Sequence, residues 1–502
     1  MSVQDRWSQL HSKRSQVLTR ARDAAELTIP SLMPPEGHNE NTVLNQPYQS
    51  LGARGVNNLS SKLLLALMPA NQPFFRLSTS AAVQAELNVP KTDLEAAFRA
   101  IETEIMGRLE RSNIRTVLHM SLKHLVVTGN ALMYLPKSGR NRMYPLDRYC
   151  VGRAADGRVI EVVIKETVNP DTLAEDVQVA TKITARDTMV EGKARADVDV
   201  YTHVKLKDGK HHWLQEINDI EVPESRGEAP EATSPFIALR WTSIANEDYG
   251  RGHVEEYMGD LRSLEGLSAA IVSFSSAAAR ILILLSPNSA MDADDLAAPT
   301  GSVVVGKADD VSIFQLDKFA DFRVSKDVVD DLSLRLSHAF LLTSGTVRNA
   351  ERVTAEEIRL QAQELEDVLG GVYTVQSQEL QLPLVVRTQS ILTAEGVIQA
   401  LPGVEATIVT GFDALGRGHE LNKLRAYFQD AISMFGPEAI QFFKTDAGLQ
   451  MLATAHNVDI VDLLKTMEEV SGEQQQAQNA ALAQKAAGPA AGAMAKGMME
   501  QQ

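Results

Sequence analysis

The amino-acid sequence predicts an α+β fold that is mainly helical. Of its 502 residues, 44% are hydrophobic and 23% are charged, a balance typical of globular proteins. Aromatic residues make up only 5%, while Ala, Leu and Gln are plentiful, which favours helices over an aromatic-rich β-sandwich. Apolar residues recur every three or four positions through most of the chain, but they alternate between residues 131 and 242. We therefore expect a β-rich segment between two helical regions.

Four helices are expected before the β-rich segment. In the first, Trp7, Leu10 and Val17 recur at helical spacing, and the breaker sequence IPSLMPPEG follows it. The second stops at Pro69, because proline lacks the N–H that would continue the helix. The last of the four ends at the Gly129-Asn130 turn. The four helices are expected over residues 3–28, 48–68, 92–111 and 114–128.

The β-rich segment carries six strand-like stretches and two hairpin signals. The stretches ALMYL, MYPLDRYCV, RVIEVVIKETV, DVDVYTHVKL, HHWLQEI and PFIALRW alternate or run apolar, as strands do. Asp156-Gly157 and Asp208-Gly209 are dipeptides that favour tight hairpin turns. Residues 169–197 are polar and receive no assignment.

Helical spacing returns after residue 251. One helix is expected over 252–284, which contains no proline, and another over 324–342. Between them two short strands are expected, SVVVG (302–306) and VSIFQL (311–316). The remaining elements are a long helix to about 393, a strand at 405–410 and small helices over 417–470. The tail 473–502 is low-complexity Ala, Gln, Gly and Met, which predicts frayed helix or disorder.

The long helix has a firm start and two weak points. Thr354 and Glu357 form a capping box, in which hydroxyl and carboxylate bind the first free amides. Gly370-Gly371 costs about 1 kcal/mol per residue relative to alanine, and Pro383 bends the axis. If it is helical throughout, about 40 residues span about 60 Å, a length suited to a strut in a large assembly. The alternative is two helices that meet at a Gly-Gly turn.

Charge and apolar content exclude several classes of protein. Lys and Arg total 49 and Asp and Glu total 65, so the net charge is −16. An acidic chain is a poor sequence-blind DNA binder, although it can lie beside DNA without holding it. The longest apolar stretches, KLLLALMPA and ILILLSP, fall short of the roughly 20 residues needed to cross a bilayer. The N-terminus is too polar for a secretory signal, so we expect a soluble protein made in a reducing cytoplasm.

The sequence offers no convincing catalytic, cofactor or metal site. GSVVVGKA (301–308) nearly fits the phosphate-binding loop, but three valines favour a strand and Ala308 replaces the hydroxyl. His203, His211 and His212 could in principle ligate a metal, but adjacent strand residues point to opposite faces and no carboxylate or cysteine completes a ligand set, so we expect solvent-facing strand histidines. His119 and His124 are expected to be half-buried.

The single cysteine and the acidic clusters have ordinary interpretations as well. Cys150 excludes an intrachain disulfide and a Cys-rich metal site, and we expect a semi-buried apolar residue. The clusters MDADD (291–295) and VVDD (328–331) lack the spacing of a calcium loop and indicate solvated faces. Their relevant residues are Asp292, Asp294, Asp295, Asp330 and Asp331.

Several stretches, taken together and in order, resemble one protein family. They are GARGVNNLSSKLLLALMP, HLVVTGNALMYLP, YGRGHVEEYMGDLRSLEGL, ERVTAEEIR, ELEDVLGGVY and SQELQLPLV. In this combination they resemble the portal proteins, or head-to-tail connectors, of short-tailed podovirus bacteriophages. The resemblance covers roughly residues 3–430 and is weaker toward the C-terminus.

The resemblance implies a ring of about twelve subunits around a central channel, at one vertex of the capsid. Double-stranded DNA would enter through it during terminase-driven packaging and leave through it during ejection. The implied partners are further copies of the chain, major capsid and scaffolding proteins, terminase, tail adaptor proteins and passing DNA of any sequence. The implied location is the virion, after assembly in the host cytoplasm. No enzymatic activity, cofactor or membrane contact is implied.

The resemblance also assigns a role to each segment. These are a wing (1–250), a first stem helix (251–284), a clip (285–323), a second stem helix (324–343), a tunnel loop (344–353), a kinked wing helix with a return strand (354–410), a crown (411–472) and the tail (473–502). The helix kink would involve Gly370, Gly371 and Pro383, and the acidic clusters would lie on the clip and the channel wall.

The tunnel loop would face DNA through Thr346, Val347, Arg348, Asn349, Glu351 and Arg352. Arg348 and Arg352 suit transient phosphate contact, or equally salt bridges with Glu351, Glu356 or a neighbouring subunit. Ala350 stands where the family often has glycine, which suggests a stiffer loop. Two other functions stay open: a head scaffold or adaptor protein, and a packaging motor subunit that binds nucleotide at 301–308.

Overall fold

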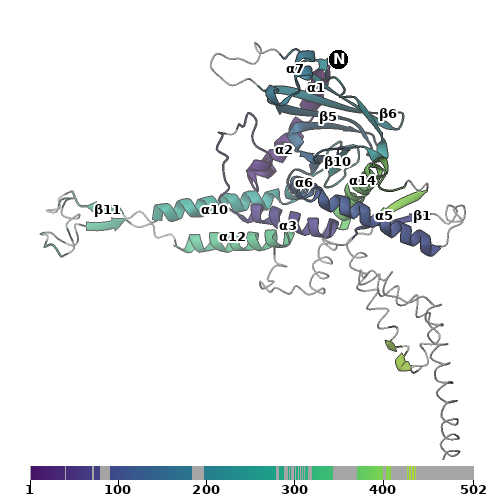
Figure 1. Cartoon of the computed structure of the whole chain (residues 1–502). Coiled ribbons are helices and arrows are strands. Elements are labelled where there is room, and N and C mark those ends of the chain that lie inside the picture. The colour runs from purple at the N-terminus through teal and green to yellow at the C-terminus, as the bar shows by residue number, and fades with distance from the viewer. Residues whose placement is uncertain are drawn as a thin grey trace, which may run out of the picture. The chain divides into compact units, whose positions relative to one another are not determined.

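The structure is a computed structural model of the chain. It describes residues 2–39, 41–69, 73–79, 91–183, 197–278, 282–287, 311–314, 319–342, 370–399 and 403–408, with single positions between 292 and 309 and between 427 and 436. The chain divides into two compact units, Met1–Ala414 and Leu415–Gln502. Every helix and strand given below belongs to the first unit. Helices and antiparallel sheets are both present, as an α+β fold requires (Figure 1).

The first predicted helix is two helices, α1 (Val3–Lys13) and α2 (Ser15–Glu26). The break falls at Arg14, whose backbone leaves helical geometry. Its buried guanidinium donates hydrogen bonds to the carbonyl oxygens of Leu146 and Tyr149. Those carbonyls lie far along the chain, so periodicity alone does not reveal the break.

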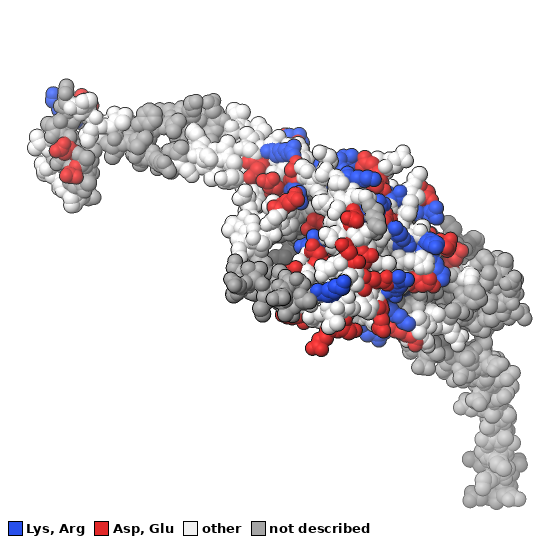
Figure 2. Space-filling view, turned by 90° about the horizontal axis from the view of Figure 1, so that it is seen from above, with Lys and Arg blue, Asp and Glu red and all other residues white. Residues whose placement is uncertain are grey.

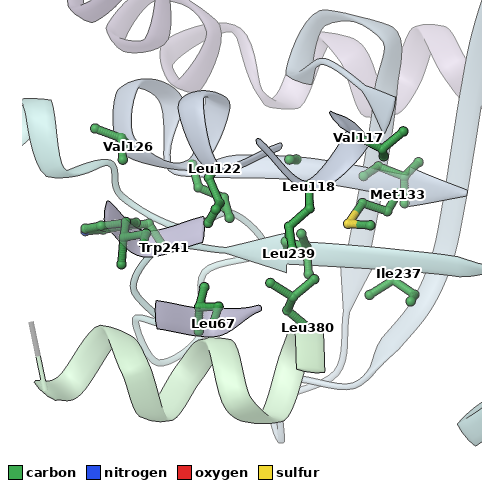
Figure 3. Packing of buried hydrophobic residues seen from close by; sticks show 14 of the residues in the cluster. Leu67, Val117, Leu118, Leu122, Val126, Met133, Ile237, Leu239, Trp241 and Leu380 are labelled. Atoms are coloured by element: carbon green, nitrogen blue, oxygen red, sulfur yellow. The ribbon is translucent and has the colours of Figure 1, made fainter. Parts of the chain in front are cut away.

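The other three helices of this region were predicted correctly. They are α3 (Leu51–Leu67), α5 (Lys91–Arg111) and α6 (Ile114–Thr128). Gly129 ends α6 with a φ of +76°, the left-handed conformation that glycine adopts at helix ends. In Figure 3, strand β10 runs between α6, which contributes Leu118 and Leu122, and the helix that carries Leu380. These apolar faces form the main core.

The β-rich segment forms two antiparallel sheets, and both hairpin turns are confirmed. The larger sheet has the order β4-β5-β6-β7-β8, with β9 also paired to β7, and the smaller has the order β10-β2-β3. Asp156-Gly157 joins β4 to β5, and Asp208-Gly209 joins β6 to β7. The strands are β2 (Asn130–Tyr134), β3 (Arg142–Tyr144), β4 (Tyr149–Arg153), β5 (Val159–Val168), β6 (Val198–Lys207), β7 (Lys210–Ile217), β8 (Ile220–Glu221), β9 (Gly227–Pro230) and β10 (Phe236–Arg240).

Short helices complete this region. The unassigned segment 169–197 contains one α-helical turn and one 3₁₀ turn within its described part. The short elements are η1 (Pro30–Leu32), η2 (Leu146–Arg148), η3 (Pro170–Thr172), α7 (Glu175–Ala180), η4 (Glu231–Thr233) and α9 (His253–Glu256).

The two helices expected after residue 251 are present, with corrected limits. Helix α10 (Met258–Ala278) packs against α12 (Phe319–Ala339), which starts five residues before the expected 324. The prediction of helix up to 284 is wrong, because β11 (Leu282–Leu285) is a strand paired with β12 (Val311–Phe314). A short run of leucine and isoleucine fits a buried helix or a strand equally well, and only the partner decides.

The strand predicted at 302–306 is absent from the described positions of that segment. Ser302, Val303 and Val305 lie outside any strand, and β12 takes β11 as its partner instead. Val303 and Val305 are 96% and 83% exposed. Branched side chains favour extended backbone, but a strand also needs a neighbour to pair with.

The C-terminal helix is continuous over its described part. Residues 370–376 are helical, and the wider π-helical turn η7 (Ser377–Gln381) and α14 (Leu382–Ala394) follow. The expected return strand is β13 (Val404–Ile408), which pairs with an unpredicted strand, β1 (Phe75–Thr79). Within the predicted crown (411–472) the structure describes only a few positions, which are helical at Tyr427, 429–430 and 432–434, and the tail (473–502) lies outside the described residues. Among the residues described, we find no helix that combines the length and the apolar character needed to span a bilayer.

Candidate functional site

Many of the predicted site residues lie outside the described part of the chain. They are the loop residues Thr346, Val347, Arg348, Asn349, Glu351 and Arg352, the cap residues Thr354 and Glu357, and Asp295. Of the others, Gly370 and Gly371 lie within a helix and Pro383 is at the start of α14. These positions therefore give no evidence of a Gly-Gly turn.

The distal half of α10 has a surface without charge. Residues 266–278 read GLSAAIVSFSSAA and contain no Asp, Glu, Lys or Arg. From 266 to 276 no side chain is buried, and Val272 is 48% exposed. Figure 2 shows few charged side chains along this part of the surface, in contrast to the dense mixture of charges on the main body. A charge-free helix surface that the chain itself does not bury suits a contact with another protein.

Helix α12 buries one stripe and exposes the rest. Leu332 and Leu336 are buried, whereas Val324, Val328 and Leu334 are 64%, 43% and 54% exposed. Asp330 and Asp331 are both exposed, and the Asp331 carboxylate lies 3.3 Å from the Arg335 guanidinium. The expectation of a solvated acidic face is therefore confirmed at these two positions.

Strands β11 and β12 and the described positions between them expose apolar and acidic residues together. Leu284 is 51% exposed, and Asp292 and Asp294 are exposed as well. After GSVVVGKA, the described residues are Asp309, in a 3₁₀ turn, and strand β12, so no α-helix follows among them. A phosphate-binding loop needs a helix at that point, so the described residues argue against nucleotide binding here.

The π-helical turn carries a half-buried carboxylate that pairs with a buried arginine. The Glu379 carboxylate accepts hydrogen bonds from the backbone N–H of Arg240 at 3.0 Å and from its Nε at 2.9 Å. Arg153 lies 3.9 Å from the same carboxylate, and burial lowers the pKa of this guanidinium more than nearby Glu379 raises it. Gln376 donates to the Arg240 carbonyl at 2.7 Å, and Gln381 donates to the Leu67 carbonyl at 2.8 Å. These bonds tie the long helix to β10 and α3.

Pro383 accounts for the position of this turn. In a regular α-helix, residue 383 would donate its N–H to the carbonyl of Glu379, and proline has no N–H. The Leu382 N–H instead bonds the Ser377 carbonyl, five residues back, as in a π-helix. Pro383 in the sequence indicates an irregularity in the helix, but it does not predict the wider turn or its polar contacts.

Close backbone packing accounts for three glycines in VVTGN and YGRGH, two sequences from the stretches that carry the family resemblance. A Cβ at Gly252 would lie 2.7 Å from the Val127 carbonyl oxygen, and one at Gly129 would lie 2.5 Å from the Gly252 nitrogen. Asn130 bridges the two segments, since it accepts from the Gly250 N–H at 2.8 Å and donates to the Gly250 carbonyl at 2.9 Å. The end of α6 and the start of α9 thus meet backbone to backbone.

The prediction of solvent-facing histidines is wrong for two of the three. His211 is buried, and the His203 Nε2 lies 2.7 Å from the Glu161 carboxylate. Glu161 also accepts hydrogen bonds from Arg6 of α1, so this carboxylate links α1 to His203 of the sheet. The docking of α1 on the sheet encloses this group, and no sequence pattern announced that contact. His212 is 43% exposed, as expected.

His124 and Cys150 are more deeply buried than the sequence predicts. His119 is half-buried as expected, but His124 is buried, and this lowers its pKa to about 4. Cys150 is fully buried, not semi-buried, which raises its pKa to about 11. No group of three or more potential metal ligands occurs among the described residues.

Comparison with known proteins gives consistent matches. The family described as "Bacteriophage head to tail connecting protein" matches residues 1–461. The portal protein of Escherichia phage T7 is 40% identical over 480 residues, which cover 92% of this chain and 88% of the relative. That of Enterobacteria phage T3 matches to the same extent. That of Enterobacteria phage SP6 is 34% identical over 432 residues, with 84% and 82% coverage.

Proposed function

The chain belongs to the bacteriophage head to tail connecting proteins, the portal proteins of podophages, and we propose that its copies close into a ring of about twelve around a central DNA channel. Double-stranded DNA passes through this channel, inward during terminase-driven packaging and outward during ejection. The ring is placed at one vertex of the capsid in the virion and is assembled in the host cytoplasm.

The observation that carries the proposal is the uncharged distal half of α10 beside the exposed apolar residues of α12. Val272 of α10 and Val324 of α12 are 48% and 64% exposed in the single chain. When one surface of each copy contacts a different surface of the next copy, the copies close into a ring if the rotation between neighbours is a whole-number fraction of a full turn. The α10–α12 pair offers two such surfaces, and neighbouring copies would cover the apolar residues that one chain leaves open.

Charge supports passage of DNA rather than tight binding. Each copy contributes a net charge of −16, and the described acidic residues of α12 face solvent. A wall of negative charge repels phosphates and leaves few fixed binding points for a moving duplex. In this proposal Arg348 and Arg352 of the tunnel loop make transient phosphate contacts, and the acidic residues Asp330 and Asp331 line the channel.

The segments take the roles that the family resemblance implies. The clip (285–323), which includes the β11–β12 hairpin, meets terminase first and tail adaptor proteins later. The wing (1–250) and the kinked wing helix (354–410) face capsid and scaffolding proteins, and the crown (411–472) lies inside the head.

Electron microscopy of the purified full-length chain tests the proposal. We expect rings of about a dozen copies with an axial hole, and particles built with this chain should package DNA of unrelated sequences equally well. A single globular particle at concentrations where portal rings assemble would overturn the proposal. Added ATP should leave the melting temperature unchanged, since a stabilising ligand would raise it.

A further inference from the structure

The C-terminal end of α12 has a geometry that leucine rarely adopts. The N–H of Leu342 donates to the Ser337 carbonyl at 2.7 Å, and that of Leu341 donates to the His338 carbonyl at 3.1 Å. Leu341 has a φ of +54°, so it occupies the left-handed position of a Schellman-type helix end, where glycine is usual. A side chain at this position costs free energy, so other contacts must hold it there.

Two side chains of α3 supply these contacts. The Lys62 Nζ donates to the Leu341 carbonyl at 2.8 Å, and the Asn58 Nδ2 donates to the carbonyls of Phe340 and Leu341, both at 3.1 Å. The last carbonyls of a helix have no partner within the helix and carry the negative end of its dipole. An ammonium group and an amide at this point therefore stabilise the end of α12. We refer to Asn58 and Lys62 as the α3 clamp.

The same face of α3 is shaped to receive this helix end. Gly55 precedes Asn58 by three residues, and a Cβ there would lie 2.5 Å from the ring of Phe340. On the other side, His253 of α9 lies with its Nε2 3.0 Å from the Ala339 carbonyl oxygen. Phe340 and Leu341 are both almost fully buried. The chain thus leaves α12 from a point fixed by two neighbouring helices.

We propose that Asn58 and Lys62 are positioning residues that fix the end of α12, from which the chain continues into segment 344–353. They transmit force that acts on this segment into α3 and the main core. The assignment of 344–353 as the DNA-facing loop rests on the proposed function. A duplex that pulls on the loop acts on the last turn of α12, and helix ends fray readily. The clamp holds that turn, so the point at which the chain leaves α12 stays fixed while DNA moves through the channel.

Hydrogen exchange in the full-length protein tests the clamp directly. We expect the amides of residues 340–342 to exchange about tenfold faster or more in Lys62→Met and in Asn58→Ala, because each loses a hydrogen bond at the helix end. Lys62→Arg keeps the positive charge and should restore protection. Arg54→Met, which removes an exposed cation from the same helix, is the matched control and should change nothing.

Retention of packaged DNA distinguishes a positioning role of the α3 clamp from a general contribution to the stability of the fold. Lys62→Met is expected to form rings and to keep its melting temperature, yet to retain less packaged DNA than Lys62→Arg or Arg54→Met. Unchanged exchange at 340–342 in both clamp variants, or an equal loss of retention in Arg54→Met, would overturn the inference. If a variant fails to form rings, hydrogen exchange at residues 340–342 in the unassembled chain decides whether the α3 clamp holds the end of α12. If the wild-type chain itself forms no ring, the proposed function fails while the exchange result still stands for the clamp.

Discussion

At the scale of single residues, helix α1 is held on the larger sheet by a small network of charged groups. Burial alone would raise the pKa of Glu161, but hydrogen bonds from Arg6 and His203 outweigh it and hold this pKa below its ordinary value. Burial lowers the pKa of His203, with a contribution from Lys205, and this exceeds the opposing effects of Glu161 and Glu216. In the folded protein Glu161 is therefore charged and His203 neutral at pH 7.

Acidification should release α1 in two stages. Both pKa values are lowered in the folded state, so the unfolded state binds protons first as the pH falls, and stability falls with it. The His203 contribution is complete above about pH 6.5 and declines below it, and the Glu161 contribution declines below about pH 4.5. Hydrogen exchange of the amides of Val3–Lys13, corrected for intrinsic rates, should show protection that decreases from pH 7 to pH 3.

The variant Glu161→Gln supplies the control for this network. It removes the charge that Arg6 binds, so protection of α1 should already be lower at pH 7 and should lose the second stage of its pH dependence. Equal protection of α1 at pH 7 and pH 4.5 in the unaltered chain would show that this network does not hold the helix.

At the scale of elements, the long C-terminal helix combines a firmly held half with a weak point. Gln376, Glu379 and Gln381 bind it to β10 and α3, whereas Gly370 and Gly371 have no atom within 4 Å of the position of a Cβ. The glycines are therefore not required by packing among the described residues. The effect that follows from the described residues is a weaker helix, and the bend that the family resemblance implies at these glycines stays a prediction.

Replacing both glycines by alanine should stabilise the chain and impair its function. Each replacement removes a helix penalty, so the free energy of unfolding should rise by about 2 kcal/mol in total. Denaturant unfolding measures the gain, and DNA packaging measures the loss. Gly252→Ala is the contrasting control, since its Cβ would lie 2.7 Å from the Val127 carbonyl oxygen and should destabilise the chain. A destabilised Gly370→Ala/Gly371→Ala chain would contradict the helical assignment.

The elements also show what periodicity can predict. Helices α3, α5 and α6 and both hairpin turns follow from local patterns, because spacing, proline and Asp-Gly signals act within a few residues. The break at Arg14, strand β11, and the contact of His203 with Glu161 each depend on a partner distant in the chain. For the site, the sequence indicated Gly370, Gly371 and Pro383, but the α3 clamp requires knowing where α12 ends against α3.

At the scale of the whole molecule, charge is distributed unevenly. The chain carries a net charge of −16, yet residues 266–278 carry none. A monomeric protein gains solubility from charges on exposed helices, so an uncharged helix surface indicates burial in an assembly. Stability of the single chain and closure of the ring should therefore depend on different residues.

Val272→Asp should separate these two properties. Val272 is 48% exposed, so a charge there should change the free energy of unfolding by no more than about 0.5 kcal/mol. In a ring the same charge would be buried without a partner, which costs several kcal/mol per contact and opposes closure. Sedimentation should show unassembled chains with a normal melting temperature. Val179→Asp, at a 78% exposed position on α7, should assemble as the unaltered chain does. Rings of normal size formed by Val272→Asp would show that this half of α10 lies outside the subunit contact.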